Sequence, residues 1–312
     1  MDTFVAINPH AGGGSVGRAW PDLERLLGQR IGAFDHILAR DHGDITRHVG
    51  AAVAAGARRV IAVGGDGTVN EAVNGLGRPD GGIAEGVAFG VVPIGTGGDF
   101  ARHFGISADP EVAVAAILAG KTRAIDIGRV RLVDGDGRPG ARLFANIASF
   151  GISGLVDREV AALSARQWLN GTAAYFLATV LAIFGHRTQR IRLKLDDDPV
   201  VEIDTALVVA ANCRYFGGGM MIAPDADPAD GALDVIVLRG ASKWTLLKDF
   251  SLVYRGRHRA HPQITITRAR RLQVEPAPDN RGGAVLLDID GEAIGQLPAT
   301  FEVLPGALRV LV

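Results

Sequence analysis

Short apolar runs alternate with helical patterns in the first 120 residues of the chain. Helices are predicted in 18–30, 43–56 and 108–120, with Asp44 as the cap of the second, and with Asp109 or Ser107 as the cap of the third ahead of Pro110. Strands are predicted between them, in 3–8, 33–38, 58–63 and 87–93. Such alternation predicts a parallel sheet with helices on its faces.

The pattern changes after Lys121, where strand-like segments with a period of two become dominant. They lie at 122–133, 141–152, 189–197, 200–212, 232–240, 263–275 and 284–292. We therefore expect an α/β domain over 1–122 and a mostly antiparallel, β-rich domain over 123–312. Helical patterns at 157–185 and 242–256 interrupt the strands. The first is apolar, which is typical of a core helix and leaves the lining of a lipid pocket open as an alternative.

Three glycine-rich loops follow predicted strands of the first domain, at Asn8–Gly14, Gly64–Thr68 and Gly95–Asp99. Glycines let a ligand approach the backbone closely, and a helix N-terminus offers free N–H groups and partial positive charge. In open parallel sheets ligands bind at the carboxyl ends of the strands. The loops therefore predict a phosphate site, although tight structural turns would give the same local pattern.

The loop spacing excludes two common nucleotide motifs. It matches neither G-x-G-x-x-G nor G-x-x-x-x-G-K-[ST], so no Walker lysine is available to neutralise phosphates. Positive charge must come from a metal ion, an arginine or helix ends. An acid at Asp66, among the glycines, fits a metal-bound phosphate better than a bare one.

Acids also gather in the second domain. Asp288, Asp290 and Glu292 recur with a period of two, which predicts one strand face and a general base beside a metal-binding carboxylate. A solvated strand face with a D-G-E turn is the alternative. Asp225, Asp227, Asp230 and Asp234 form a second acidic segment that fits either a hard-cation site or a plain acidic turn.

Composition narrows the function classes. The 312 residues are 47% hydrophobic, and 33 basic residues balance 34 acidic ones for a net charge of −1, which argues against a nucleic-acid partner. The single cysteine, Cys213, excludes an internal disulfide and fits a reducing compartment. We expect no secretory signal and no transmembrane segment. Arginine-rich stretches at 254–261 and 267–272 fit solvated faces or contact with an anionic membrane.

Five motifs in order, "NPHAGGG", "GGDGTVNEAVNGL", "PIGTGGDFAR", "GGGMMIAPDADPADGALDV" and "DIDGE", resemble the diacylglycerol kinase and sphingosine kinase family, over nearly the whole chain. The GGDGT element alone is shared with NAD kinases and, more distantly, with phosphofructokinases, whereas the later motifs point to lipid kinases. The resemblance implies a nucleotide-binding domain of the phosphofructokinase and NAD-kinase type, a lipid-substrate domain, and an active site in the cleft between them.

The resemblance also implies roles for individual residues. ATP would be bound by Asn8, Pro9, Gly12, Gly13, Gly14, Arg40, Gly64, Gly65, Asp66, Gly67, Thr68, Asn70, Glu71, Gly95, Thr96 and Asp99. Asp66 and Asp99 would organise catalytic Mg²⁺ or its waters, and Asp290 or Glu292 would accept the proton. A structural Mg²⁺ would be bound by Asp230 with the carbonyls of Asp227 and Ala232.

The chain departs from the family pattern at two positions. Ala39-Arg40 stands where a threonine often follows the second strand, so Arg40 replaces a lost nucleotide contact or leaves it unmade. Gly98 stands where an asparagine commonly precedes the acid.

The expected function is ATP-dependent phosphorylation of a lipid hydroxyl, most simply that of diacylglycerol, by a cytoplasmic enzyme that meets membranes peripherally. A kinase of a soluble acceptor such as NAD, and a nucleotide-binding regulator without turnover, stay open as alternatives. The particular lipid and the oligomeric state, including a homodimer, are not encoded in any motif of the sequence.

Overall fold

A computed structural model describes residues 2–94, 98–133, 139–153, 155–156, 182, 185, 187–240, 243 and 252–312. The chain divides into two compact units. Unit 1 combines Met1–Ile127 with Leu304–Val312, and unit 2 is Gly128–Val303. Two strands, β5 (Thr122–Val133) and β16 (Glu292–Leu311), each carry the chain from one unit into the other.

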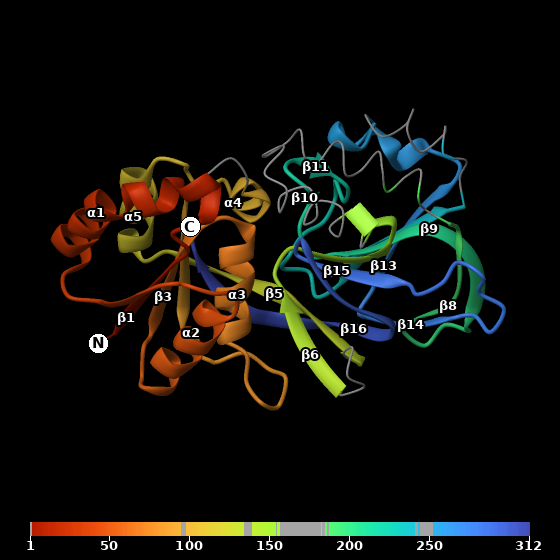
Figure 1. Ribbon diagram of the computed structural model, residues 1–312, viewed down its shortest axis with the longest axis horizontal. Helices are drawn as coiled ribbons and strands as arrows, with labels where there is room; N and C mark the ends of the chain where they lie inside the picture. The colour runs from red at the N-terminus through yellow and green to blue at the C-terminus, as the bar shows by residue number, and fades with distance from the viewer. Residues whose placement is uncertain are drawn as a thin grey trace. The chain divides into compact units, whose positions relative to one another are not determined.

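Unit 1 is a parallel sheet with helices on its faces (Figure 1). Its strands run in the order β2-β1-β3-β4, and the end of β16 adds a fifth strand parallel to β4. The strands are β1 (Thr3–Ile7), β2 (Asp35–Leu38), β3 (Arg59–Gly64) and β4 (Ala88–Pro93). The helices are α1 (Ala11–Ile31), α2 (Asp44–Ala54), α3 (Asp66–Gly75), α4 (Asp99–Phe104) and α5 (Pro110–Ala119).

The two faces of this sheet are covered by different helices. Val5, Ile7 and Ile61 pack with Leu27 of α1 and Ile117 of α5 in one buried cluster. Helices α2 and α3 contact each other and strand β1. Because side chains alternate along a strand, both faces of β1 and β3 are apolar, which is why these strands read as continuous hydrophobic runs.

Unit 2 is a mostly antiparallel sheet. Its central order is β13-β12-β9-β7-β15-β16, with β14 joining β16 to β8, and with β5 pairing β6 and β16. The remaining bounds are β6 (Pro139–Phe144), β7 (Ile147–Gly151), β8 (Gln189–Leu195), β9 (Val201–Ala211), β12 (Leu233–Arg239), β13 (Ile264–Ala269), β14 (Arg271–Pro276) and β15 (Leu286–Ile289). A small hairpin of β10 (Tyr215–Phe216) and β11 (Met220–Met221), and the 3-10 helix η1 (Arg257–Ala260), complete it.

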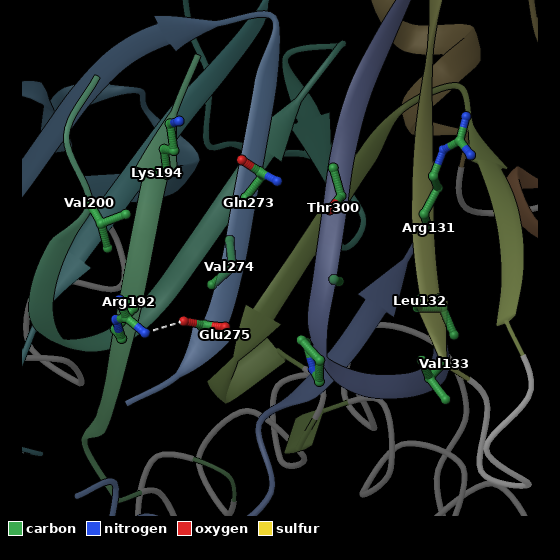
Figure 2. Close-up of a pocket in the computed structure, with 12 residues that line it drawn as sticks. Arg131, Leu132, Val133, Arg192, Lys194, Val200, Gln273, Val274, Glu275 and Thr300 are labelled. Atoms are coloured by element: carbon green, nitrogen blue, oxygen red, sulfur yellow. Dashed lines mark hydrogen bonds and ion pairs between the residues drawn. The ribbon is translucent and has the colours of Figure 1, made fainter. Parts of the chain in front are cut away.

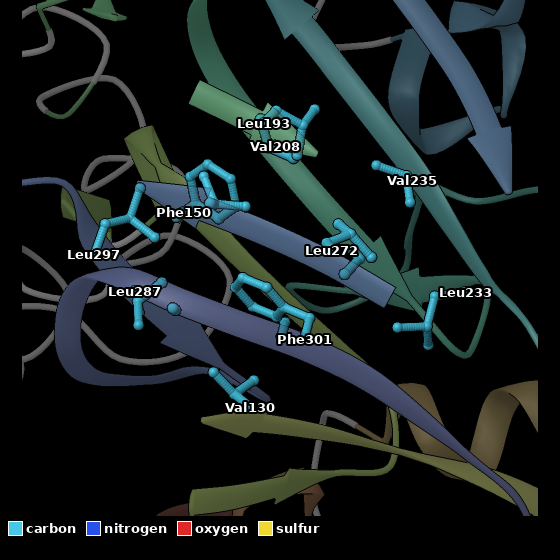
Figure 3. Packing of buried hydrophobic residues seen from close by; sticks show 14 of the residues in the cluster. Val130, Phe150, Leu193, Val208, Leu233, Val235, Leu272, Leu287, Leu297 and Phe301 are labelled. Atoms are coloured by element: carbon cyan, nitrogen blue, oxygen red, sulfur yellow. The ribbon is translucent and has the colours of Figure 1, made fainter. Parts of the chain in front are cut away.

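The inner faces of these strands enclose one large apolar core (Figure 3). Phe150 of β7 and Phe301 of β16 are stacked there, with ring centroids 5.8 Å apart. Leu272 of β14 and Leu287 of β15 are fully buried beside them. This core fixes β7 and β15 side by side, and those two strands carry the acidic hairpin described below.

The predicted fold class is confirmed, an α/β unit with a parallel sheet followed by a β-rich unit. Two details differ from expectation. The pattern gives no sign of β16, because Pro298 and Pro305 interrupt its alternation. Its last residues return to unit 1, so that unit is not a continuous stretch of chain.

One predicted helix cap is confirmed and one is wrong. The Asp109 side chain accepts a hydrogen bond from the Glu111 N–H and caps α5, with Pro110 in the first turn. Helix α2, however, is capped at Gly43, and Asp44 is already its first residue. The helical region predicted in 157–185 lies almost wholly outside the described residues, and Gly95 and Thr96 lie outside them as well. Of the region predicted in 242–256, residues 243 and 252–256 are described, and 252–254 are helical.

Candidate active site

The loop after β1 is shaped by three consecutive glycines. Gly12, Gly13 and Gly14 all adopt left-handed backbone conformations, with φ of 59°, 64° and 82°. Residues with a Cβ rarely adopt this conformation, so the run requires glycine. The Asn8 side chain accepts a hydrogen bond from the His10 N–H at 3.0 Å, which closes the turn that begins the loop. The predicted members Asn8, Pro9 and Gly12–Gly14 therefore form one compact turn at the carboxyl end of β1.

The loop after β3 brings a strand and a helix into close contact. A Cβ added at Gly64 would lie 2.9 Å from the Cβ of Thr68, so only glycine fits there. The Thr68 hydroxyl is buried and makes no hydrogen bond to any described residue. Helix α3 begins here without a side-chain cap. An uncapped helix N-terminus and a buried hydroxyl without a partner both suit an anionic ligand.

Asp66 fastens this loop to the next one. Its two carboxylate oxygens accept hydrogen bonds from the backbone N–H groups of Asp99 and Phe100, both at 3.0 Å. Asp66 therefore caps helix α4, although it lies in the first turn of α3. Asp99 does not cap its own helix, because Gly98 holds the cap position and Asp99 is the first helical residue. The bond brings the Asp66 carboxylate against the backbone of Asp99, whose side chain is 2% exposed.

Glu71 also holds a helix. Its carboxylate accepts hydrogen bonds from the N–H groups of Gly43 at 3.1 Å and Ile45 at 3.2 Å. The His42 ring lies 3.3 Å from the other carboxylate oxygen. Glu71 thus supplies the acceptor that α2 lacks from its own cap residue. Its position in the motif predicts a nucleotide contact, and the geometry gives it a role in the shape of the site.

Arg40 lies in the loop between β2 and α2, and its side chain is exposed. Its N–H donates to the Asp44 carboxylate at 2.9 Å, as does that of Asp41 at 3.2 Å. These backbone hydrogen bonds lower the pKa of Asp44 below its ordinary value, with the neighbouring Arg47 adding to the effect. The loop that would meet a nucleotide at Arg40 is therefore held in a fixed turn.

The acidic motif of unit 2 is a hairpin rather than one strand face. Ile289 of β15 pairs with Glu292 of β16, so Asp290 and Gly291 form the two-residue turn between them. Both turn residues have positive φ, 51° and 87°, as a type I′ turn requires. The prediction that the three acids share one face is wrong, because the period of two ends at the turn. Cross-strand partners share a face, so Asp288, which pairs with Ala293, points away from the face of Glu292.

Asp290 anchors the turn to unit 2. Its carboxylate accepts three backbone hydrogen bonds, from the N–H groups of Ala145 at 3.0 Å, Asn146 at 3.1 Å and Ile147 at 2.8 Å. Both oxygens are therefore engaged in holding the segment that leads into β7. The neighbouring Glu292 begins β16 and is half-buried.

The residues of the predicted structural metal site lie in the acidic segment before β12. The Asp227 side chain accepts from the Ala229 N–H at 3.2 Å, and Asp230 accepts from the Ala232 N–H at 3.0 Å. Asp230 is also paired with Arg268 of β13. No group of three His, Cys, Asp or Glu side chains suited to a metal ion occurs among the described residues. The carbonyl ligands expected here are not tested by that result, so the site stays a prediction.

The other two acids of this segment, Asp225 and Asp234, differ from each other in their surroundings: the first is paired with an arginine and the second is buried. Asp225 pairs with Arg259 of η1, so one arginine of the basic stretch at 254–261 is engaged in an ion pair. Burial raises the pKa of Asp234 to about 6, and the charge of Asp225 adds to the effect.

The residues of unit 1 fit a magnesium-bound triphosphate. Mg²⁺ in phosphoryl-transfer sites takes one or two carboxylates and completes its shell with phosphate oxygens and waters. Asp66 and Asp99, held together by the hydrogen bond between them, can supply this number. Thr68 and the uncapped start of α3 lie on the same loop as Asp66. The donor set therefore matches the cofactor that the motifs predict.

A separate cavity lies on the outer face of the unit 2 sheet (Figure 2). Its volume is about 440 Å³, and strands β5, β8, β14 and β16 supply most of its lining. Arg192 and Glu275, two of its lining residues, form an ion pair at 2.6 Å. None of its lining residues belongs to the predicted site.

Motif spacing missed the residues that hold these acids in place. Ala145–Ile147 contact Asp290, and Ser149 contacts Asp288, in each case about 140 positions away. Neither segment carries a local signature. Gly95 and Thr96 fall outside the described residues, so their predicted nucleotide contacts stay predictions. Among the helices that the structure describes, none has the length and hydropathy needed to cross a membrane.

Comparison with known proteins places this chain in a family. Residues 2–130 match the diacylglycerol kinase catalytic domain, and residues 146–312 match the YegS C-terminal NAD kinase beta sandwich-like domain. A diacylglycerol kinase of Mycobacterium tuberculosis is 31% identical over 97% of this chain and 93% of its own. One from Bacillus subtilis is 31% identical over 81% of this chain and 77% of its own.

Solved structures agree at the level of the fold. A crystal structure of a diacylglycerol kinase from Bacillus anthracis strain Sterne aligns with a TM-score of 0.72 and 21% identity, over 99% of this chain and 96% of that chain. Another structure from the same strain aligns with a TM-score of 0.76 and 22% identity, over 99% of this chain and 97% of that chain. With both of its domains matched and a curated relative aligned over nearly its full length, the chain belongs to the diacylglycerol kinase family and is a kinase.

Proposed function

We propose that this protein transfers the γ-phosphate of ATP to the hydroxyl of a lipid, with diacylglycerol or a related lipid as the acceptor. The observation that carries the proposal is the pairing of Asp66 with the backbone of Asp99, at a glycine-rich strand end. The names of the curated relatives support a lipid acceptor.

The residues of unit 1 bind and orient the nucleotide in this proposal. The left-handed glycines 12–14 and the start of α3 receive the phosphates, with Thr68 donating its hydroxyl. Asp66 and Asp99 would hold Mg²⁺ or its waters. When bound, Mg²⁺ supplies the positive charge that offsets the phosphates, since the loops contain no Walker lysine. Glu71 supports the nucleotide site indirectly, because it caps α2 and holds the loop that contains Arg40.

Glu292 is the proton acceptor in this proposal. The alternative, Asp290, already directs both oxygens to three backbone N–H groups, and those donors stabilise its ionised form. A carboxylate committed in this way is a poor base. Glu292 is two residues further along the chain, half-buried, and placed on the first residue of a strand. It receives the proton of the acceptor hydroxyl as the phosphoryl group arrives.

A lipid acceptor requires the protein to meet a membrane or micelle surface. Exposed Tyr254, Arg255 and Arg257 offer an aromatic and cationic edge beside η1. Such side chains favour anionic interfaces. We therefore propose a cytoplasmic protein that is bound to membranes peripherally during turnover.

The acceptor class is tested by ADP release over a panel of substrates. Diacylglycerol, a sphingoid base, ceramide and phosphatidylglycerol in detergent micelles are compared with NAD and glucose in the same buffer. Lipid-dependent ADP release supports the proposal. Release that depends on NAD or glucose instead, or ATP binding without release on any acceptor, contradicts it.

A further inference from the structure

A chain of three buried polar side chains lies behind the acidic hairpin of unit 2. The Ser149 hydroxyl lies 2.8 Å from the Ser153 hydroxyl and donates to the Asp288 carboxylate at 2.9 Å. The other oxygen of Asp288 accepts from the Gly291 N–H at 2.9 Å. Relative exposure is 0% for Ser149, 6% for Ser153 and 5% for Asp288. This series of hydrogen bonds therefore runs through the protein interior and ends at Gly291, in the turn that precedes Glu292.

Its partners come from the two strands that hold the hairpin. Ser149 belongs to β7, and Asp288 faces it across the β7–β15 pair. The bond to Gly291 is made by the second turn residue, which is covalently joined to Glu292. Asp288 therefore determines where the backbone enters β16, while Asp290 fixes the first turn residue from the other side.

Such a carboxylate is costly to keep in an interior position. Burial of an acid is unfavourable unless hydrogen bonds compensate, and a turn alone does not require it because Asp-Gly already favours the type I′ conformation. Asp288 is buried and accepts a hydrogen bond from Ser149, which is bonded in turn to Ser153. This arrangement points to a requirement for accurate placement of Glu292, the first residue after the turn.

We propose that Asp288 is a positioning residue for phosphoryl transfer, acting with Ser149 and Ser153 through Gly291 to set the position of Glu292. The proposal rests on the proposed function of Glu292 as the proton acceptor. In the ionised state of Asp288, Ser153 donates to Ser149 and Ser149 donates to Asp288. An asparagine at 288 can keep its oxygen on Gly291 if the hydroxyl chain reverses, because its amide then donates to Ser149.

The test compares Asp288→Ala, Asp288→Asn and a matched control, Thr205→Val. Thr205 is fully buried in β9, and its hydroxyl bonds to the Leu207 and Leu238 carbonyls. Its replacement removes buried hydrogen bonds of the same unit without touching the hairpin. Steady-state kcat per folded molecule, KM for ATP, and hydrogen exchange of the 286–296 peptide are measured for each variant.

The alanine variant is expected to lose about tenfold to a hundredfold in kcat with KM for ATP unchanged, because displacement of a reacting group costs rate more than binding. Its 286–296 peptide should exchange faster. The asparagine and Thr205→Val variants should keep kcat within about threefold of the wild type and leave exchange of this peptide unchanged. If the alanine variant does not fold, Ser149→Ala carries the test, with a smaller fall in kcat and faster exchange.

An alanine variant with kcat and exchange like those of the wild type overturns the proposal. Equal losses of kcat in the alanine and Thr205→Val variants also overturn it, since both would then reflect general stability. If the wild type transfers no phosphate to any lipid, the proposed function fails, and exchange of the 286–296 peptide still decides whether Asp288 fixes the turn.

Discussion

The Asp66 carboxylate accepts a hydrogen bond from the backbone N–H of Asp99, so the acid of one glycine-rich loop caps the helix that begins with the acid of the next. The bond is 3.0 Å long and a second one reaches Phe100. The two acids that the sequence motifs suggest as metal ligands are therefore joined by a hydrogen bond. Substitutions at Asp66 will affect both the cap of helix α4 and the negative charge available to a metal ion.

Asp66→Asn and Asp66→Ala should separate these two effects. Asparagine keeps one side-chain oxygen, which replaces one of the two acceptors of the α4 N–H groups, and it loses the charge. Transfer should therefore fall at least about a hundredfold, while the free energy of unfolding should fall by less than in the alanine variant. Alanine should abolish transfer and also lower the free energy of unfolding by about 1 kcal/mol. Thermal melts with kinase assays at saturating Mg²⁺ measure both. An asparagine variant with full activity would remove the metal role.

Glu71→Ala should weaken unit 1 at helix α2. The variant leaves the Gly43 and Ile45 N–H groups without their acceptor, which should cost about 1 to 2 kcal/mol in the free energy of unfolding. KM for ATP should rise because the loop containing Arg40 loses its support. Urea denaturation and ATP titration provide the two readings. Unchanged stability would show that the cap contributes nothing measurable.

Asp290→Asn and Glu292→Gln should both lose activity but differ in their effect on stability. Asp290 holds three backbone N–H groups, so its variant should lose stability together with activity. Glu292→Gln should keep its melting temperature and lose about a hundredfold or more in kcat, as expected for loss of a general base. The pair is compared in one buffer by melting and by initial rates. A fully active Glu292→Gln enzyme would assign the base elsewhere.

Glu302→Gln should give a pH-dependent loss of stability in unit 2. Burial raises the pKa of Glu302, but its hydrogen bonds and ion pairs with Arg129 and Arg131 outweigh burial and hold the pKa below the ordinary 4.5. The stabilisation is therefore present above about pH 4.5 and disappears as the pH falls through the lower pKa of the folded state.

Its size should be about 1.5 to 3 kcal/mol at pH 7, the range for hydrogen bonds to charged groups. Denaturation of the wild type and the variant at pH 7 and at pH 3 measures the difference. Equal differences at the two pH values would show that the ion pairs do not stabilise the fold.

Local pattern was enough to predict strands β1 to β4 and helices α1, α2 and α5 of unit 1, and much of unit 2. The apolar runs at β1, β3 and β4 are buried on both faces, so their composition alone identifies parallel strands. Asp109 and Pro110 form a cap within three residues, which makes it readable from sequence. Strand β16 could not be recognised, because its prolines break the alternation and its ends belong to different units.

The parts of the site that could not be predicted depend on long-range contacts. Asp66 and Asp99 each belong to a glycine-rich motif, but the hydrogen bond between them joins positions 33 residues apart, which no local pattern indicates. The turn at Asp290-Gly291 reverses the chain after a run that looks like one strand, so period-two reasoning places three acids on one face when they lie in three settings. Ser149 belongs to no motif, and only the pairing of β7 with β15 brings it to Asp288.

The most direct test of the central claim is transfer of labelled γ-phosphate from ATP, with Mg²⁺, into diacylglycerol in mixed micelles, followed by organic extraction. The Asp66→Ala variant is the control. We predict label in the organic phase for the wild type and none for the variant. An organic phase without label, from a wild-type protein that still binds ATP, would contradict the claim that this kinase acts on a lipid hydroxyl.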